Sequence, residues 1–149
     1  MYTFADKLLE VSERHADKIA SQWCKAVTAN PHTPWFQSMK HPDCISFAEE
    51  FYRNFRVVYF DEKPYTKLKK FFDNYAEESF RKGIPPEEAI YALIMMRRHL
   101  WLYADFNALF LTALDAHRAV ETLNRTIRVF DQGVFIIIKR YRELEKAKK

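Results

Sequence analysis

The sequence predicts an all-α fold of about five main helices, with a long helix at its carboxyl end. Apolar residues recur every three or four positions along most of the 149 residues, and no run shows the strict alternation of a half-buried strand. The chain has only two glycines, Gly83 and Gly133. A dinucleotide-binding fingerprint, a P-loop or a nucleophile elbow each needs several glycines within a few residues, so the sequence excludes these classes.

The first helix is expected from about Thr3 to Ala29, where apolar residues follow this spacing. A loop is expected over residues 31–42. Three prolines in this segment remove amide donors and bias the residues before them away from a helix. Within the loop, Trp35 and Phe36 are expected to fold back onto the core.

The second helix is expected from about Cys44 to Phe60. Asp43 could cap its start, or Ser46 could do so with Glu49 three residues later in a capping box. The apolar face of this helix comprises Phe47, Phe51, Phe55 and Val58.

The third helix is expected to end at Lys82, because Gly83 suits the left-handed position just past a helix end. Its apolar set comprises Leu68, Phe71, Phe72, Tyr75 and Phe80. Two prolines at 85–86 begin the fourth helix, since proline is tolerated in the first turn. We expect this helix to reach at least Ala113.

The last helix, from about Asp115 to Lys146, has the most regular spacing in the chain. Its heptad seam comprises Leu123, Ile127, Phe130, Val134, Ile137, Tyr141 and Leu144. The middle of the helix is expected inside the domain, and the end past Arg140 is expected to project. A close helix crossing would account for Gly133. The exposed apolar residues of the seam are expected to pack against a helix of a partner, which predicts a homodimer.

Charge is concentrated at the carboxyl end. The chain carries 24 Lys and Arg against 20 Asp and Glu, and the whole excess lies in residues 139–149. We expect one domain over residues 1–149, with 139–149 as its basic projecting helix end. The neutral body argues against nucleic-acid binding. An alternative is that the tail alone binds a membrane surface or nucleic acid in a salt-dependent way.

The amino-terminal residues lack the basic and apolar regions of a signal peptide, and no stretch approaches the ~20 apolar residues of a membrane span. We therefore expect a cytoplasmic protein without a membrane span. Cys24 and Cys44 could form at most one disulfide, and we expect both to be reduced.

No catalytic constellation is evident, because the serines lack a glycine-bounded turn and a base partner. We therefore expect no enzyme activity. His41 and Cys44 have a possible metal-ligand spacing, with Cys24 and His32 upstream. Zinc sites usually show two paired ligand motifs, so no metal site is expected.

The fourth helix places Arg97 in line with core positions, and Arg98 lies one step round the helix. A buried arginine needs a carboxylate or carbonyl partner. The candidate partners are Asp73, Glu77, Asp105 and Asp131. One interpretation is a structural ion pair between helices. The other is an anion or small-ligand pocket lined by Arg97, Arg98 and Trp101.

Haem binding is a further alternative, because His99 and His117 lie in helical segments rich in Leu, Met and Phe. Either histidine could serve as an axial ligand in an apolar pocket. No haem-attachment motif is present, and a single histidine on an apolar face is usually a core residue. We therefore expect no cofactor, with haem as the alternative.

The stretch RKGIPPEEAIYALIMMRRHLW, residues 81–101, resembles the N-terminal domain of RsbT co-antagonist (RsbRD-type) proteins. In that family a basic residue, a glycine and a hydrophobic residue lead into a helix that bears Arg-Arg and Trp. The ending RTIRVFDQGVFIIIKRYRELEKAKK resembles the last helix of the same domain, and Trp23 and the segment FAEEFYRNF also fit.

The resemblance implies a stressosome-like sensory domain with a globin-like helical fold and no haem. It implies a homodimer that signals through its last helix to a STAS domain or a kinase. In this chain, the signalling residues would be Ile127, Val134, Ile137, Tyr141 and Leu144. Because no output domain follows in this sequence, we expect that a separate protein partner provides the output.

Overall fold

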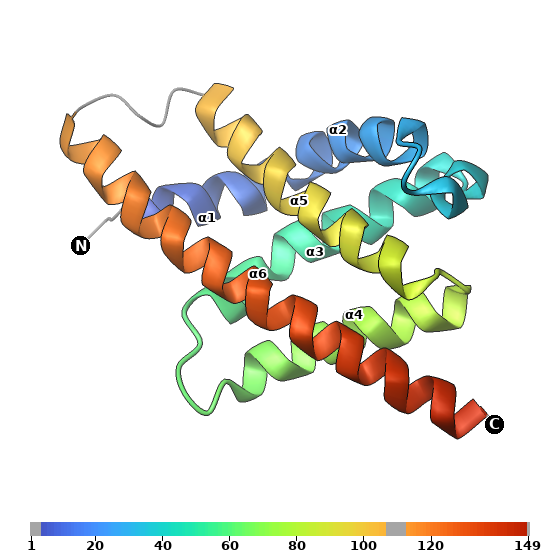
Figure 1. Ribbon diagram of the computed structural model, residues 1–149. Helices are drawn as coiled ribbons and strands as arrows, with labels where there is room; N and C mark the ends of the chain where they lie inside the picture. Colours follow the sequence, from blue (N-terminus) through green and yellow to red (C-terminus); the bar gives the residue numbers. More distant parts are fainter. Residues whose placement is uncertain (1–3, 107–112, 149) are drawn as a thin grey trace.

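The computed structural model describes residues 4–106 and 113–148, and within them the chain forms six α-helices, one short 3₁₀-helix and no strand. The all-α prediction is therefore confirmed. The elements are α1 (Phe4–Arg14), α2 (Ala16–Ala29), the 3₁₀-helix η1 (Pro34–Ser38), α3 (His41–Tyr59), α4 (Thr66–Lys82), α5 (Pro86–Phe106) and α6 (Ala113–Lys148). Helices α5 and α6 lie at the front of the molecule in Figure 1, with α3 behind α5 and α4 behind α6.

The first expected helix is divided into α1 and α2 at His15, so the prediction of one continuous helix over 3–29 is wrong. His15 has φ −114° and ψ 24°, which is outside the helical region. No proline or glycine marks this break. Because the helical spacing continues across it, the sequence pattern gives no sign of the bend. Thr3 lies outside the described residues.

The proline-rich segment folds back onto the core, as expected. Phe36 is fully buried, and its ring meets the edge of Trp23 at a centroid distance of 5.7 Å. Trp35 is half-buried, and its backbone N–H donates to Glu88 Oε1 at 2.8 Å. This segment is partly helical, because η1 lies inside the predicted loop.

Helix α3 begins at His41, three residues before the predicted start. Lys40 is the N-cap and makes no side-chain capping bond, so the predicted caps at Asp43 and Ser46 are wrong. Pro42 accounts for the earlier start, because proline is favoured in the first turn of a helix. Asp43 lies in the first turn, where a carboxylate interacts favourably with the helix dipole.

Gly83 ends α4 in the left-handed conformation, with φ +88°, as predicted. Its N–H donates to the Phe80 carbonyl at 3.0 Å, and the next N–H, of Ile84, donates to the Ser79 carbonyl at 3.0 Å. These two bonds satisfy carbonyls that the helix end would otherwise leave without partners.

The predicted boundary between the last two helices is wrong, because Ala113 is the first residue of α6 rather than part of α5. The described part of α5 ends at Phe106, and residues 107–112 lie outside the described residues. No proline or glycine occurs between Trp101 and Asp115, so the sequence lacks the strongest stop signals here.

Gly133 lies where α6 crosses α4, which confirms the expected close crossing. It is buried, and a Cβ added there would lie 2.6 Å from two ring carbons of Phe72. Phe72 is itself fully buried. Only a residue without a side chain therefore allows this approach.

Side chains from three helices anchor α5 through its backbone carbonyls. Trp23 Nε1 of α2 donates to the Ala92 carbonyl at 3.0 Å, and the Tyr52 hydroxyl of α3 donates to the Met96 carbonyl at 2.7 Å. The Tyr75 hydroxyl of α4 donates to the Ala89 carbonyl at 2.8 Å. The three acceptors are three and four residues apart, so they lie on one face of α5.

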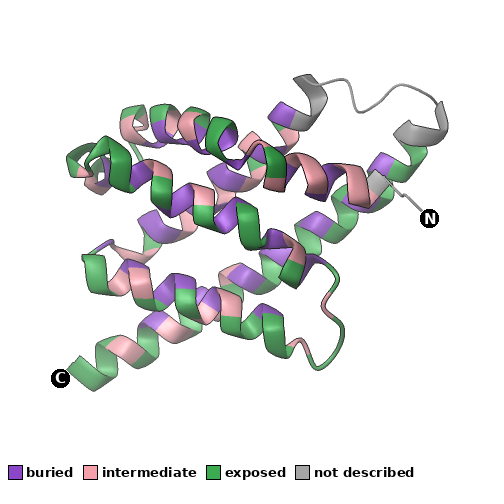
Figure 2. Ribbon diagram, turned by 180° about the vertical axis from the view of Figure 1, so that it is seen from behind, coloured by how far each residue is buried: buried purple, intermediate pink, exposed green. Residues whose placement is uncertain are grey.

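Buried residues form a continuous core between the helices, visible as the purple inward faces in Figure 2. The predicted α3 face, formed by Phe47, Phe51, Phe55 and Val58, is buried as expected. None of the helices in residues 4–106 and 113–148 is long and apolar enough to cross a membrane.

Candidate functional site

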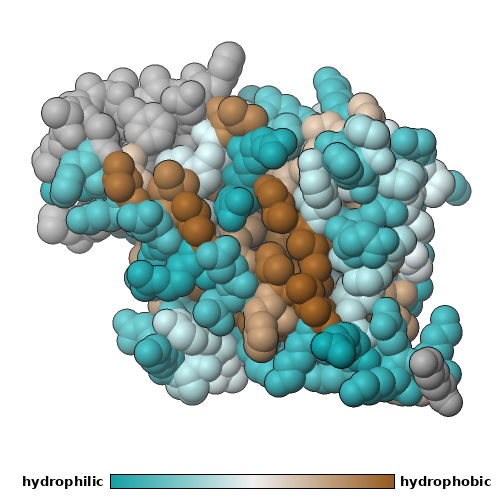
Figure 3. Space-filling view, in the orientation of Figure 1, coloured by the Kyte–Doolittle hydropathy of each residue, from teal (hydrophilic) through white to brown (hydrophobic). Residues whose placement is uncertain are grey.

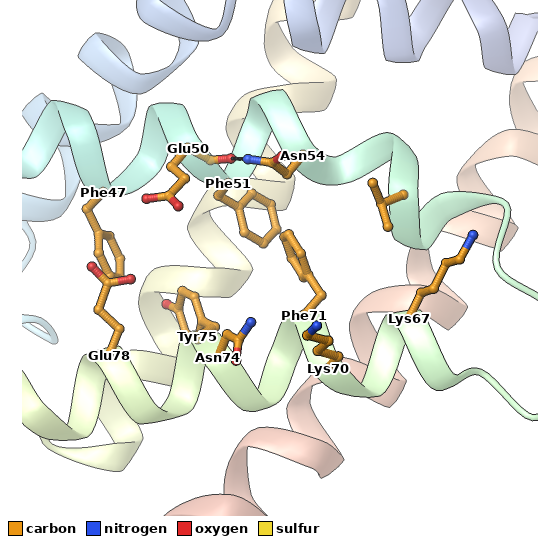
Figure 4. A pocket seen from close by; sticks show the side chains of 11 residues that line it. Phe47, Glu50, Phe51, Asn54, Lys67, Lys70, Phe71, Asn74, Tyr75 and Glu78 are labelled. Atoms are coloured by element: carbon orange, nitrogen blue, oxygen red, sulfur yellow. Dashed lines mark hydrogen bonds between the residues drawn. The ribbon is translucent and has the colours of Figure 1, made fainter.

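A groove of about 480 Å³ runs between α3 and α4 (Figure 4). Its volume lies within the range of about 300–1,000 Å³ that is typical of small-molecule sites. The lining comprises Phe47, Glu50, Phe51, Asn54 and Val57 from α3, and Lys67, Lys70, Phe71, Asn74, Tyr75 and Glu78 from α4. Two helices alone therefore supply the whole groove.

Four aromatic rings form the floor of the groove. The Phe47 and Tyr75 centroids are 5.5 Å apart, and the Phe51 and Phe71 centroids are 5.3 Å apart. Phe51 and Tyr75 lie 6.4 Å apart, which joins the two pairs. The hydrogen bond from Tyr75 to the Ala89 carbonyl fixes one ring from below. The floor is therefore packed and positioned before any ligand arrives.

Acidic and basic side chains lie toward opposite ends of the groove rim. Glu50 and Glu78 lie at the Phe47 end, and Lys67 lies at the far end (Figure 4). Lys70 lies on the side of the groove toward Lys67. The groove therefore has an acidic end and a basic end above an aromatic floor.

The floor of the groove also contacts α6. The Phe51 ring lies 5.8 Å from the Phe130 ring, and Phe55 lies 5.5 Å from the same ring. The Arg97 guanidinium lies over another part of Phe130, with its carbon 5.9 Å from the ring centroid. Phe130 is thus a direct packing link between the groove and the last helix.

Arg97 contacts an aromatic ring of α6. Its guanidinium is half-buried against Phe130, and among the described residues no carboxylate forms an ion pair with it. Asp73 pairs with Lys69, and Glu77 pairs with Arg140. A third candidate partner, Asp105 of α5, has its side chain outside the described part of the chain. A cation over an aromatic face needs no carboxylate partner.

The residues of the predicted arginine pocket differ in their burial. Arg98 is exposed, whereas Trp101 is half-buried and packs against the core. Neither the α3–α4 groove nor the second described cavity is lined by Arg97, Arg98 or Trp101. The second cavity, about 220 Å³, lies between the α3–α4 connection and α6.

The two histidines of the haem alternative lie in different environments. His117 is on the surface of α6, where its side chain is 75 % exposed and its Nε2 is 3.7 Å from Glu121. This placement lacks the apolar pocket that an axial ligand requires. His99 is half-buried, and burial, followed by the neighbouring Arg98 charge, lowers its pKa.

The lowered pKa of His99 predicts a loss of stability at acidic pH. In the unfolded chain His99 takes up a proton near its usual pKa of about 6.5, whereas the folded protein takes it up only at lower pH. Below about pH 6.5 the unfolded state binds more protons than the folded state. The free energy of unfolding therefore decreases as the pH is lowered, by at most about 1.4 kcal/mol per pH unit. Urea denaturation at about pH 7.5, 6.5 and 5.5 measures this slope.

His99→Gln is expected to reduce this acid slope, and His117→Gln serves as the matched surface control. An equal slope in wild type and His99→Gln would contradict the assignment to His99.

The predicted seam of α6 is divided between the inside and the outside of the domain. Ile137 and Tyr141 are 0 % and 2 % exposed, so they are core residues and cannot contact a partner. Val134 and Leu144 are half-buried, and Ile127 is exposed. The large apolar residues that α6 exposes are Val120, Leu123, Ile127, Phe135 and Ile138. We call these five residues the α6 stripe.

The carboxyl end of α6 packs on α4 at least as far as Tyr141. The Tyr141 hydroxyl donates to the Ile84 carbonyl at 2.8 Å, and its ring meets that of Phe80 at 5.7 Å. Lys148 Nζ lies 5.9 Å from the centroid of the same Phe80 ring. Beyond Tyr141, residues 142–148 are exposed except for the half-buried Leu144.

Both cysteines are free and buried, Cys24 on α2 and Cys44 on α3. A hydrogen bond with Cys44, together with burial, raises the pKa of the Cys24 thiol. Within residues 4–106 and 113–148, no group of three or more His, Cys, Asp or Glu residues is placed to hold a metal ion.

Comparisons with protein-family models, curated proteins and solved structures give no match. The resemblance to the RsbRD-type domain and the globin-like arrangement therefore stay predictions.

Proposed function

We propose that this chain is a non-catalytic regulatory domain that forms a homodimer through the α6 stripe. The observation that supports this proposal is the exposure of large apolar side chains along one helix. Phe135 is 65 % exposed, Val120 57 % and Ile138 43 %. In Figure 3, hydrophobic side chains gather in strips on the face that carries α5 and α6. Exposed apolar surface of this kind is typical of interaction sites.

A second copy of the chain is the partner that fits this surface best. Val120, Ile127 and Ile138 lie on one line along α6, because at 100° per residue their directions differ by no more than about 20°. A twofold axis would place this line against itself, as in most small oligomers. Asp131 is the one exposed charge near the middle of the line.

The proposed regulatory role follows the resemblance given above. A signal would alter the packing of α5 and α6, and α6 would carry the change to a separate partner such as a STAS domain or a kinase. The contact of Phe130 with Phe51, Phe55 and Arg97 supports such coupling, because it joins α6 to both α3 and α5.

Light scattering tests the dimer. The wild type is expected to have the mass of a dimer at micromolar concentration. Phe135→Glu and Ile138→Glu are each expected to weaken dimerisation by about 30-fold or more, since a central apolar contact contributes about 2 kcal/mol. Gln132→Glu introduces the same charge at an exposed position of α6, about 120° or more around the helix from the line of Val120, Ile127 and Ile138, and it should remain a dimer.

A wild-type monomer that persists at high concentration would overturn the dimer. Equal weakening by Gln132→Glu would show that added charge on α6, rather than loss of the stripe, drives dissociation.

A further inference from the structure

We infer that the α3–α4 groove binds a small elongated molecule with an apolar body, an amine at one end and an acidic group at the other. The floor favours the apolar body. Phe47, Phe51 and Tyr75 are at most 8 % exposed, and their packed rings need little rearrangement to receive a ligand. Preorganised apolar surface reduces the entropic cost of binding.

The acidic end of the groove suits an amine. Glu50 is exposed, and no cation among the described residues pairs with its carboxylate. Glu78 has one weak partner, Lys82, at 3.9 Å. The Phe47 ring lies between these two glutamates in Figure 4. A positively charged group there would meet two carboxylates and an aromatic face, which is a favourable combination for ammonium recognition.

The basic end suits an acidic group. Lys67 and Lys70 are both exposed, and neither forms an ion pair with a described carboxylate. The neighbouring lysine that does pair, Lys69 with Asp73, lies outside the groove lining. An anion at this end would be held by two ammonium groups that have no competing ion-pair partner among the described residues.

The spacing of the two ends gives the length of the ligand. Lys67 and Glu78 are eleven residues apart on α4. At 1.5 Å per residue this corresponds to about 16 Å along the helix. From Lys70 to Glu78 the corresponding distance is about 12 Å. An aliphatic chain of about ten to twelve carbons spans this length between its charged ends.

Occupation of the groove would act on α6 through Phe51, which contacts Phe130. This step rests on the proposed regulatory function, whereas binding itself does not. The groove would then be the input site of the domain, and the α6 stripe its output surface.

Calorimetric titration with ω-aminododecanoic acid tests the binding site. The wild type is expected to bind this probe at least about tenfold more tightly than ω-aminohexanoic acid, which is too short to reach both ends. Glu50→Gln and Lys70→Gln should each weaken binding about two- to fivefold, the usual effect of losing one exposed ion pair. Lys25→Gln on the exposed face of α2 is the matched control.

Asn74→Trp, at an exposed position on the rim, should fill the groove and abolish binding without altering the core. Binding should be retained in the Phe135→Glu variant, so failure of the dimer and failure of the ligand site are distinguishable. The inference is overturned if the wild type does not bind the longer probe. Equal affinity of the wild type for the two probes would overturn it as well. So would an Asn74→Trp variant that binds the longer probe as tightly as the wild type.

Discussion

Gly133→Val is expected to destabilise the protein by about 3 kcal/mol. The first added carbon alone would lie 2.6 Å from the ring of Phe72, and valine adds two more. Phe72 is fully buried between α4 and α6, so its ring has no open space to enter. Either the helices separate or the ring leaves its preferred rotamer. Gly133→Ala should cost less, about 1–2 kcal/mol, because alanine regains about 1 kcal/mol of helix propensity.

Chemical denaturation followed by circular dichroism measures both changes. Gln132→Val is the matched control, since it places the same side chain at the neighbouring exposed position, where the expected change is within about 0.5 kcal/mol. In the double variant Gly133→Ala/Phe72→Leu, replacement of the ring should relieve part of the loss in the free energy of unfolding that Gly133→Ala causes. A stabilising effect of Gly133→Ala alone would contradict the close crossing, because helix propensity would then be the only contribution left.

Helical periodicity was sufficient to predict the fold class and the buried face of α3. Phe47, Phe51 and Phe55 recur every four residues, and this spacing alone places them on one side of α3. Local stop signals also predicted helix ends where such signals exist. At Gly83, the left-handed conformation was predicted from the position of the glycine after a helical run. The crossing at Gly133 was predicted because glycine inside a helix has a cost that some contact must offset.

Boundaries without such signals could not be predicted. The break at His15 and the start of α6 at Ala113 have neither proline nor glycine nearby. In both cases the apolar spacing continues across the boundary, so the local pattern alone does not predict it. The same limit applies to the seam of α6, because spacing identifies Ile137 and Ile127 as equivalent. The packing of α6 on the other helices buries Ile137 and leaves Ile127 exposed.

The groove was beyond the reach of sequence analysis, although most of its parts were visible. Phe51, Phe71 and Tyr75 were predicted as apolar faces of two helices, and a core is the usual place for such faces. Whether two apolar faces close fully or leave a gap depends on the angle between the helices, which no local pattern encodes. Arg97 was identified as unusual for its position, and the structure places it over the Phe130 ring.

Trp23→Ala is expected to cost about 3–5 kcal/mol of the free energy of unfolding. Trp23 is fully buried, and its ring packs on Phe36 at 5.7 Å and on Phe47 at 6.0 Å. Its removal leaves a cavity between α2, η1 and α3, and it also removes the hydrogen bond to the Ala92 carbonyl. The groove should be affected too, since Phe47 forms part of its floor.

Tyr52→Phe separates the hydrogen-bonding part of this effect from the packing part. It deletes only the hydroxyl that donates to Met96, and a loss of about 1 kcal/mol is expected. Lys25→Ala, at an exposed position on the same helix as Trp23, should change stability by less than about 0.5 kcal/mol. Urea denaturation of the three variants gives the comparison. If Trp23→Ala cost no more than Tyr52→Phe, the packing of Trp23 against the two phenylalanines would contribute little beyond its hydrogen bond to the Ala92 carbonyl.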